Sequence, residues 1–268
     1  MALSEKRQGR VTGSQAGAIL GLCPWRSRED VINDWLYGSS FTGNVATEHG
    51  NFYEEYAIAD LAIELGVTLE PNEKFFIHQH LDWLGATPDV VGSNFICEIK
   101  CPYGKRKVTD PSEFKSIHDQ PHYYAQVQIE MHCTDKRKAY FYQWSPSGAS
   151  KLEVVEKDRE WLYANLPTLR AFIADVEERR KTMTDDELLA GEYLYAKKRL
   201  DAVKEELDKI KEEMIDKANG SKRKFGPVSV YPVSRKGSIP YSKVVKELLP
   251  DVDLEPYRGE PSTSWVVK

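Results

Sequence analysis

Several features that would place the chain in a specialised class are missing from its sequence. Only four of its 268 residues are cysteine. The one close pair, Cys97 and Cys101, has no second pair at a spacing typical of zinc sites. We therefore expect free thiols, as in an intracellular protein, and neither a disulfide framework nor a structural zinc site.

Long apolar runs are also missing. No segment reaches the roughly 20 apolar residues that a membrane-spanning helix needs, and the first residues contain no apolar core of a signal peptide. The sequence therefore predicts no membrane association and a cytoplasmic location. A repeat with a period of about 20–50 residues, which is typical of solenoid proteins, is not apparent either.

An excess of positive charge is absent as well. Lys and Arg number 37 against 42 Asp and Glu, which gives a net charge of −5. A nucleic-acid-binding function would therefore need a local basic surface on an acidic protein. Residues 103–118, predicted to form a loop with helical turns, contain several such side chains, which either contact a DNA backbone or only aid solubility. Apolar residues make up 41% of the chain, enough for a core, and we predict one over 1–182 and an extension over 183–268.

The residues with the clearest chemistry lie in the stretch 87–100, which reads T-P-D-V-V-G-S-N-F-I-C-E-I-K. Side chains alternate along a strand, so Glu98 and Lys100 point the same way. If two strands pair as a hairpin through residues 92–94, Asp89 faces Glu98 across the ladder. Two carboxylates suit a hard divalent cation such as Mg²⁺. A lysine beside them can orient or deprotonate a water, which suits metal-assisted hydrolysis of a phosphodiester.

The same residues have an ordinary explanation, because acidic turns and a Glu-x-Lys strand are common on solvated surfaces and short motifs recur by chance. The setting argues against it. Phe95, Ile96, Cys97 and Ile99 are typical of a buried strand, and a charged pair inside such a strand is costly without a function or a partner.

A helix predicted over residues 47–66 supplies a further acid. Its apolar stripe is Phe52, Tyr56, Ala59 and Ile63, widened by Ile58, Ala62 and Leu65. Glu54 is four residues from Ile58 and is expected beside the buried face, where it can join Asp89 and Glu98. Glu55 is expected on the solvated face.

Two other predicted helices carry polar side chains of interest. The helix within 11–21 begins near Thr12 or Ser14, either of which is a suitable N-cap. Arg7 and Arg10 precede it, so its start is either a phosphate site or an ordinary cap with solvated arginines. In the helix over 122–132, Gln126 or a tyrosine on the inner side can orient water or a phosphate.

The remaining elements are predicted from their apolar patterns. Residues 68–78 form a strand, and an antiparallel meander leads from it to Glu98 and Lys100. An aromatic strand over 138–144 lies next to the Glu98 strand, followed by a strand over 151–155 and helices over 158–180 and 185–217. The last helix has a seam for a partner helix, within the chain or on a neighbour, formed by Leu200, Val203, Leu207, Ile210 and Met214. A small ββαβ-like appendage ends the chain, with strands at 228–233 and 265–267 and a helix over 241–249.

Five stretches, taken in this order, resemble the lambda-exonuclease/YqaJ-type viral recombinase nucleases of the PD-(D/E)xK superfamily. They are R-Q-G-R-V-T-G-S (7–14), H-G-N-F-Y-E-E-Y-A (49–57), T-P-D-V-V (87–91), C-E-I-K-C-P (97–102) and Y-A-Q-V-Q (124–128). The resemblance covers about half the chain. It implies an α/β (α+β) fold with a restriction-endonuclease-like core, in which helices flank a central mixed sheet, followed by a C-terminal helix and a small α+β appendage.

The resemblance also implies a role for each matching residue. Asp89 and Glu98 would hold metal together with the carbonyl of Ile99, and Lys100 would activate the attacking water. Glu54 would be the acid on a helix that helps to position a second metal ion.

Gln126 would lie beside the scissile phosphate. Arg7 and Ser14 would resemble a pocket that grips a DNA 5′-phosphate, which favours the functional interpretation of Ser14 over capping.

The implied function is that of a Mg²⁺-dependent exonuclease, with Mn²⁺ as a substitute and two ions per site, that degrades the 5′-ended strand of double-stranded DNA. It would leave a 3′ single strand for an annealing protein of phage-type recombination, act as a ring-shaped homotrimer and work in the cytoplasm of a bacterial host. Two alternatives stay open: a structure-specific or restriction-like endonuclease, and a non-catalytic scaffold that binds DNA ends.

Overall fold

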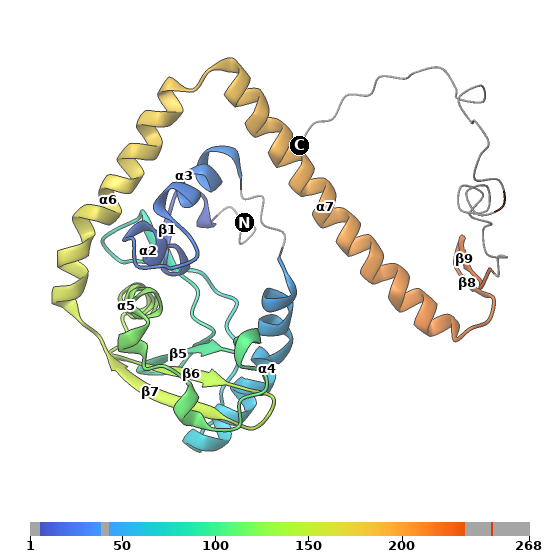
Figure 1. Ribbon diagram of the computed structural model, residues 1–268, viewed down its shortest axis with the longest axis horizontal. Coiled ribbons are helices and arrows are strands. Elements are labelled where there is room, and N and C mark those ends of the chain that lie inside the picture. The colour runs from blue at the N-terminus through green and yellow to red at the C-terminus, as the bar shows by residue number, and fades with distance from the viewer. Residues whose placement is uncertain (1–5, 39–42, 234–247, 249–268) are drawn as a thin grey trace. The chain divides into compact units, whose positions relative to one another are not determined.

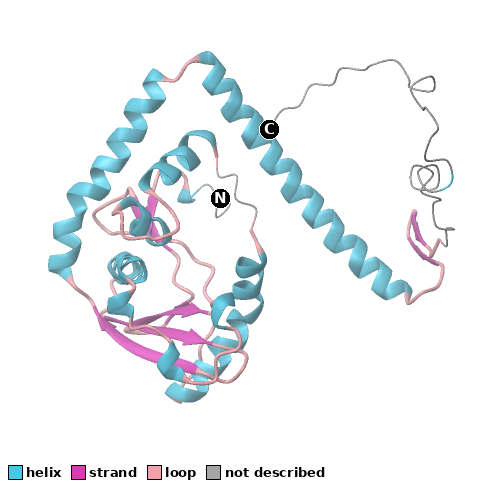
Figure 2. Cartoon of the chain, viewed as in Figure 1, coloured by secondary structure: helices cyan, strands magenta, loops and turns pink. Residues whose placement is uncertain are grey.

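The computed structural model describes residues 6–38, 43–233 and 248 (Figures 1 and 2). Its elements are β1 (Val11–Thr12), α2 (Gly13–Ile19), α3 (Arg28–Tyr37), α4 (Val45–Leu65), β2 (Phe76–Ile77), β3 (Leu84–Ala86), β4 (Val90–Val91), β5 (Phe95–Lys100), three 3₁₀ turns η1 (Tyr103–Lys105), η2 (Pro111–Glu113) and η3 (Ile117–Asp119), α5 (Pro121–Thr134), β6 (Lys138–Trp144), β7 (Ser150–Glu156), α6 (Arg159–Thr182), α7 (Asp185–Ala218), β8 (Arg223–Phe225) and β9 (Val228–Val230).

The central sheet is mixed, as predicted. Its strand order is β4-β5-β6-β7. The pairs β4–β5 and β6–β7 are antiparallel, whereas β5 and β6 run parallel with Glu98 opposite Phe141. The aromatic strand thus lies next to the strand of Glu98. Because β5 is interior, the backbone groups of its whole length are paired in a ladder, which fixes the direction of its side chains.

The predicted antiparallel meander is wrong. A second sheet has the order β1-β3-β2, and only Phe76–Ile77 of the predicted strand 68–78 is a strand. Pro88, which lacks a backbone N–H, lies between β3 and β4 and separates the two sheets. Upstream, Pro71 forms only an isolated antiparallel bridge with Val90. Asn72 N donates to the carbonyl oxygen of Asp89, and the Asn72 side chain donates to those of Lys74 and Pro88.

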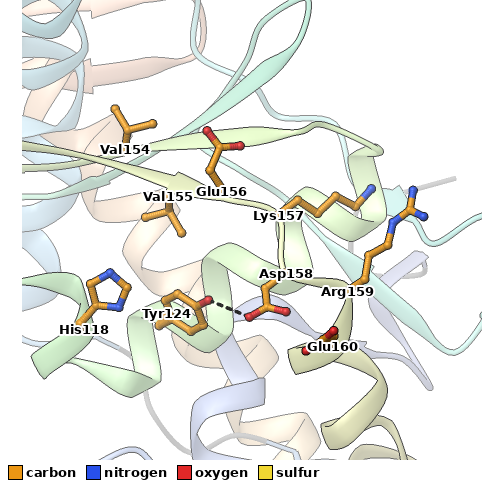
Figure 3. Close-up of a pocket in the computed structure, with 9 residues that line it drawn as sticks. All are labelled: His118, Tyr124, Val154, Val155, Glu156, Lys157, Asp158, Arg159 and Glu160. Atoms are coloured by element: carbon orange, nitrogen blue, oxygen red, sulfur yellow. Dashed lines mark hydrogen bonds between the residues drawn. The ribbon is translucent and has the colours of Figure 1, made fainter.

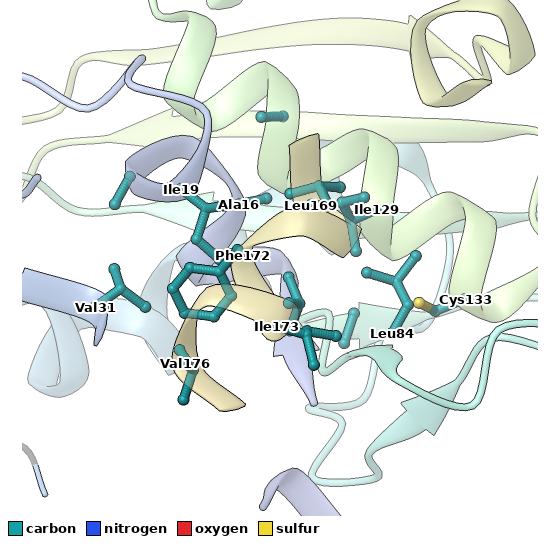
Figure 4. Close-up of a cluster of buried hydrophobic side chains, with 14 of the residues drawn as sticks. Ala16, Ile19, Val31, Leu84, Ile129, Cys133, Leu169, Phe172, Ile173 and Val176 are labelled. Carbon is teal, nitrogen blue, oxygen red and sulfur yellow. The ribbon is translucent and has the colours of Figure 1, made fainter. Parts of the chain in front are cut away.

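Helices cover both faces of the central sheet. Cys97 and Ile99 pack with Ile58 and Leu61 of α4 on one face. Ile96 packs with Val127 of α5 on the other, so Glu98, which alternates with Ile99, faces α5. A larger cluster joins α2, α3, α5 and α6 to the small sheet (Figure 4); its labelled members include Ile19, Val31, Leu84, Ile129, Leu169 and Phe172.

The buried face of α4 differs from the predicted stripe. Ala57, Ile58 and Leu61 are buried, whereas Phe52, Tyr56 and Ile63 of the predicted stripe are 62%, 58% and 81% exposed. The helix has apolar residues on two sides, and the sheet contacts the one with the smaller side chains. Glu54 precedes Ala57, Ile58 and Leu61 by three, four and seven residues, so it lies on the same side of the helix. As predicted, Glu54 is half-buried and Glu55 is exposed.

Helices α2 and α5 are in close contact. A Cβ atom at Gly17 would lie 2.7 Å from the Cβ of His122 and 2.9 Å from its Cα. A Cβ atom at Gly13 would lie 3.3 Å from the carbonyl oxygen of Gln126. Because glycine has no side chain, the two helices approach to backbone distance, and the start of α2 lies against the middle of α5.

The long C-terminal helix is confirmed as α7, and Asn219 and Gly220 end it with positive φ angles of 47° and 70°. Four positions of its predicted seam are exposed in the described part of the chain: Leu200, Val203, Leu207 and Ile210. No described helix is long and apolar enough to cross a membrane.

The chain divides into two compact units, 1–205 and 206–268; the predicted domain boundary after residue 182 stays a prediction. In the second unit, β8 and β9 form an antiparallel hairpin. The predicted helix over 241–249 and strand over 265–267 lie outside the described residues, apart from residue 248.

Candidate active site

The hairpin predicted for residues 87–100 is present. Val90 pairs with Cys97 and Val91 with Ile96, and Gly92 N donates to the carbonyl oxygen of Phe95. Continuing this register places Asp89 opposite Glu98. The Asp89 carboxylate extends one residue further, and its Oδ2 accepts a hydrogen bond from Ile99 N at 2.6 Å. Asp89 is therefore fixed at the end of the ladder beside the Glu98–Lys100 pair.

Glu98 is the centre of the site. Its side chain is 2% exposed, and its Oε1 accepts from Lys100 Nζ at 2.5 Å and from Gln126 Nε2 at 2.6 Å. These bonds confirm that Glu98 and Lys100 share a face and that Gln126 lies on the inner side of α5. The other oxygen, Oε2, is buried without a hydrogen-bond partner in the described part of the chain. A buried carboxylate oxygen without a partner is costly, and a cation ligand position is one way to satisfy it.

Negative charge is crowded around this carboxylate. Burial, then the charge of Glu98, raises the pKa of Asp89 well above its usual range. The same two causes raise the pKa of Glu54. Burial lowers the pKa of Lys100, but Glu98 and Asp89 outweigh it and leave the pKa above its usual value. Lys100 is therefore a firmly charged ammonium among several acids.

One member of the cluster was missed by sequence analysis. Glu130 is 1% exposed; its Oε1 accepts from Gln126 Nε2 at 2.9 Å, and its Oε2 is buried without a partner among the described residues. Burial, then Glu98, raises its pKa well above the usual range. The only signal in the sequence is its spacing of four residues from Gln126, which places both on one side of a helix.

The hydrogen bonds of Gln126 orient its amide. Both bonds come from Nε2, which has two hydrogens, so Glu98 and Glu130 together hold the amide nitrogen toward the acids. The amide oxygen has no partner among the described residues and is left as an acceptor. Glu130 is thus placed to position Gln126 rather than to contact a substrate itself.

We expect Glu130→Leu to lower the DNA cleavage rate about tenfold while KM for DNA stays unchanged, since the amide of Gln126 loses one of two restraints. The free energy of unfolding should be unchanged or higher, because an apolar side chain of similar size removes a buried acid. Glu130→Gln keeps an acceptor and should restore the rate. Steady-state kinetics and thermal melts of both variants test this. Equal rate losses in the two variants would contradict a positioning role.

Arg7 and Ser14, the residues of the predicted phosphate pocket, have different partners. An Arg7 guanidinium nitrogen donates to Thr87 Oγ1 at 3.0 Å, two residues before Asp89. Thr12 is the N-cap of α2, and its hydroxyl lies 3.2 Å from that of Ser14. Ser14 is exposed and is not the cap, so the capping explanation of Ser14 is wrong. Arg10 is instead engaged with the carbonyl oxygens of Lys6 and Asp82.

The donor set fits a hard divalent cation in its chemistry. Asp89, Glu98 and Glu54 offer carboxylate oxygens, one of them buried and unpaired, around a single ammonium. Within the described residues, however, no group of three or more His, Cys, Asp or Glu side chains is already arranged to hold a metal ion. Lys100 and Gln126 both hydrogen-bond to the same oxygen of Glu98. The ligand role of the Ile99 carbonyl stays a prediction.

A surface pocket of about 680 Å³ lies elsewhere, lined by His118, Tyr124 and residues 154–160. The Tyr124 hydroxyl donates to Asp158 Oδ2 at 3.4 Å across it (Figure 3). None of the predicted site residues lines this pocket, and its walls carry charges of both signs. It therefore provides no single ligand class and is separate from the acidic cluster.

Comparison with known proteins agrees with this architecture. Residues 4–137 match the family model described as YqaJ-like viral recombinase domain. The solved structure of the alkaline exonuclease LHK-Exo from Laribacter hongkongensis, in complex with dAMP, is 24% identical with a TM-score of 0.55 and is similar over 66% of this chain and 92% of that one. A phage-related exonuclease from Haemophilus somnus 129PT is 18% identical with the same TM-score over 65% and 96%. No curated protein matches the chain.

Proposed function

The chain belongs to the YqaJ-like viral recombinase domain family, and we propose that it is a metal-dependent DNA exonuclease that acts in recombination. Both the family and the mixed α+β core predicted from the sequence are confirmed. The observation that carries the proposal is the cluster of buried Glu98 and half-buried Glu54 and Asp89 around the ammonium of Lys100. Such a set is suited to phosphodiester hydrolysis.

The proposed cofactor is Mg²⁺, or Mn²⁺ in its place, at two positions. Asp89, Glu98 and the Ile99 carbonyl would hold one ion, and Glu54 would help with the other. Bound there, a divalent ion supplies positive charge for the attacking and leaving oxygens and makes a bound water more acidic.

The protein side chains have separate tasks in this proposal. Lys100 remains charged beside Glu98, so it donates hydrogen bonds that orient the attacking water and offset charge on the phosphate. Gln126 keeps its amide oxygen free and presents it to the water or the phosphate edge. The two residues approach Glu98 from different elements, β5 and α5, which fixes their separation.

We propose 5′-to-3′ polarity on double-stranded DNA ends. Arg7 is hydrogen-bonded to Thr87, two residues from Asp89, and Ser14 lies on the helix that contacts Gln126 and Glu130. A guanidinium and two hydroxyls at the edge of the acidic cluster suit a terminal phosphate. The phosphate would set how far the strand enters, and the product would be a 3′ single strand.

The assembly and partners are also proposals. A homotrimeric ring would give the acidic chain an enclosed DNA path, and the exposed apolar residues of α4, Phe52, Tyr56 and Ile63, are suited to contact between subunits. An annealing protein would take over the 3′ strand in the cytoplasm of a bacterial host of a phage. The mass of the protein in solution tests the trimer.

Digestion of linear duplexes with 5′-phosphate or 5′-hydroxyl ends, and of closed circles, tests the reaction and its direction. We expect Mg²⁺-dependent release of nucleotides from linear DNA, faster with the 5′-phosphate, and intact circles. Arg7→Gln should remove most of the preference for the phosphate, whereas Arg170→Gln on α6 serves as the matched control. Arg170 lies over the ring of Trp83, away from the acidic cluster.

The other outcomes separate the alternatives. Cleavage of closed circles would establish an endonuclease. Binding of ends without cleavage under any divalent cation would establish a scaffold. Either result would overturn the proposal.

A further inference from the structure

A solvent-exposed tryptophan lies at the rim of the acidic cluster. Trp25, in the loop between α2 and α3, is 67% exposed. Tryptophan is rarely left so open on a soluble protein without a partner, because its large apolar ring gains much from burial. Its neighbour Arg26 forms an ion pair with Asp34 of α3, which anchors the loop.

Trp25 is the outer member of a row of rings that leads to Lys100. Its ring lies 4.6 Å from that of His122, at an angle of 78°, and 6.2 Å from that of Tyr123. The Tyr123 ring in turn lies 4.9 Å from Lys100 Nζ. The Tyr123 ring therefore links the Trp25 ring to Lys100 Nζ through two contacts of 6.2 Å and 4.9 Å. Together these distances correspond to a few nucleotide steps of about 3.4 Å each.

His122, the ring beneath Trp25, is held in place by α2 and is uncharged. Gly17 allows His122 to lie directly on α2, so the ring beneath Trp25 is held by backbone contact. Burial, then the charge of Lys100, lowers the pKa of His122, so its imidazole is neutral at physiological pH. Its Nε2 is buried without a partner among the described residues. The surface offered at this rim is flat and aromatic rather than ionic.

We infer that Trp25 is a stacking platform for an unpaired nucleobase of the DNA strand whose end enters the acidic cluster. This rests on the proposed function. The scissile phosphate must reach Lys100 and Glu98 at the end of a buried strand, so the terminal nucleotides must leave the duplex. A nucleobase that loses its stacked neighbour in the duplex can stack on an indole ring instead, whichever of the four bases it is.

Stacking on Trp25 would also make DNA binding tolerant of nucleotide sequence. Every base has a π-face, whereas hydrogen bonds to base edges would select particular nucleotides. The ligand is thus a nucleobase of any kind held by its face, next to a phosphate held by charge.

The experiment uses the full chain in EDTA, so that binding is measured without cleavage. The probe is a duplex with a frayed 5′-phosphorylated end that carries 2-aminopurine at the first, second or third nucleotide, a base whose fluorescence falls on stacking. We expect quenching at one of these positions on binding to the wild type. In Trp25→Leu the quenching should disappear and Kd should rise about tenfold. Trp25→Phe should keep part of both.

Two controls make the result specific. Tyr163→Leu removes another exposed aromatic ring, on α6, and should change neither quenching nor Kd. An abasic residue at the quenched position should weaken binding of the wild type and leave no further effect for Trp25→Leu.

The outcomes separate this inference from the proposed function. Unchanged quenching and affinity in Trp25→Leu, with a wild type that cleaves DNA, would refute the platform alone. A wild type that shows Trp25-dependent quenching but never cleaves under Mg²⁺ would refute the exonuclease and keep the platform. Trp25-dependent binding of a protein but not of DNA would assign the surface to a protein partner and also overturn the inference.

Discussion

Replacing Lys100 by methionine is expected to lower the rate of DNA cleavage by a factor of about 10²–10⁴, the range for loss of a group that assists proton transfer or charge development. The variant should also be less stable in EDTA. Lys100 is the cation bonded to Glu98, and its side chain is 21% exposed. Its loss leaves the negative charges of Asp89, Glu98 and Glu54 uncompensated. We therefore expect the free energy of unfolding to fall by about 2–3 kcal/mol, somewhat less than for a fully buried pair.

Lys100→Arg is the matched control. It keeps the positive charge and should recover most of the stability in thermal melts. It should not recover the rate, because a planar guanidinium places its hydrogen-bond donors differently from an ammonium. A methionine variant that keeps more than a tenth of the wild-type rate would contradict the assignment of Lys100. Melting temperature and single-turnover rate together separate loss of folding from loss of chemistry.

The second large effect concerns Asp89, for which activity and stability should change in opposite directions. Asp89→Asn should reduce Mg²⁺-dependent cleavage at least about a thousandfold, because metal binding supplies several kcal/mol of transition-state stabilisation. In EDTA the same variant should melt at a higher temperature than the wild type at pH 8. The amide has no charge to repel Glu98 and still accepts from Ile99 N.

The pH dependence of that gain has a definite sign. Burial and Glu98 raise the pKa of Asp89 in the folded state above the unfolded value near 3.8. Below that value the carboxyl is protonated in both states and Asp89→Asn should change little. As the pH rises from that value toward the folded-state pKa, the unfolded state is deprotonated while the folded state still holds its proton. The wild type therefore loses stability over this range, and the advantage of the variant grows and then levels off above the folded-state pKa.

Asp135→Asn provides a control of opposite sign. The pKa of Asp135 is lowered by its hydrogen bond and ion pair with Lys157. The stabilisation by the ionised Asp135 carboxylate is present above its unfolded-state pKa. Asp135→Asn should therefore lower the free energy of unfolding slightly more as the pH rises. Parallel pH trends for the two variants would contradict the electrostatic account of Asp89.

The sequence was sufficient for the hairpin at the site. Alternation along β5 placed Glu98 and Lys100 on one face, and the glycine turn set the register that carries Asp89 to the same end. These are short-range rules, which act within about ten residues and do not depend on distant packing. The aromatic strand beside β5 was also predicted, from its β-forming residues, whereas its parallel direction was not.

Features that depend on distant packing were not predictable. Helix α4 has apolar residues on two sides, and the sequence favoured the bulkier side, whereas the sheet contacts Ala57, Ile58 and Leu61. Glu130 looks like any other polar helix residue until α2 and α5 are brought together over it. Thr87 gives no signal at all, since its hydrogen bond to Arg7 joins residues 80 positions apart.

The contact between Gly17 and His122 couples helices α2 and α5 at the site. Two helices that touch through backbone rather than through flexible side chains have little freedom to slide, so a change at one end is transmitted to the other. We therefore expect the hydroxyls at the start of α2 and Gln126 of α5 to move together as one rigid unit. If the site opens to admit DNA, we expect the movement on the side of α4, which carries Glu54.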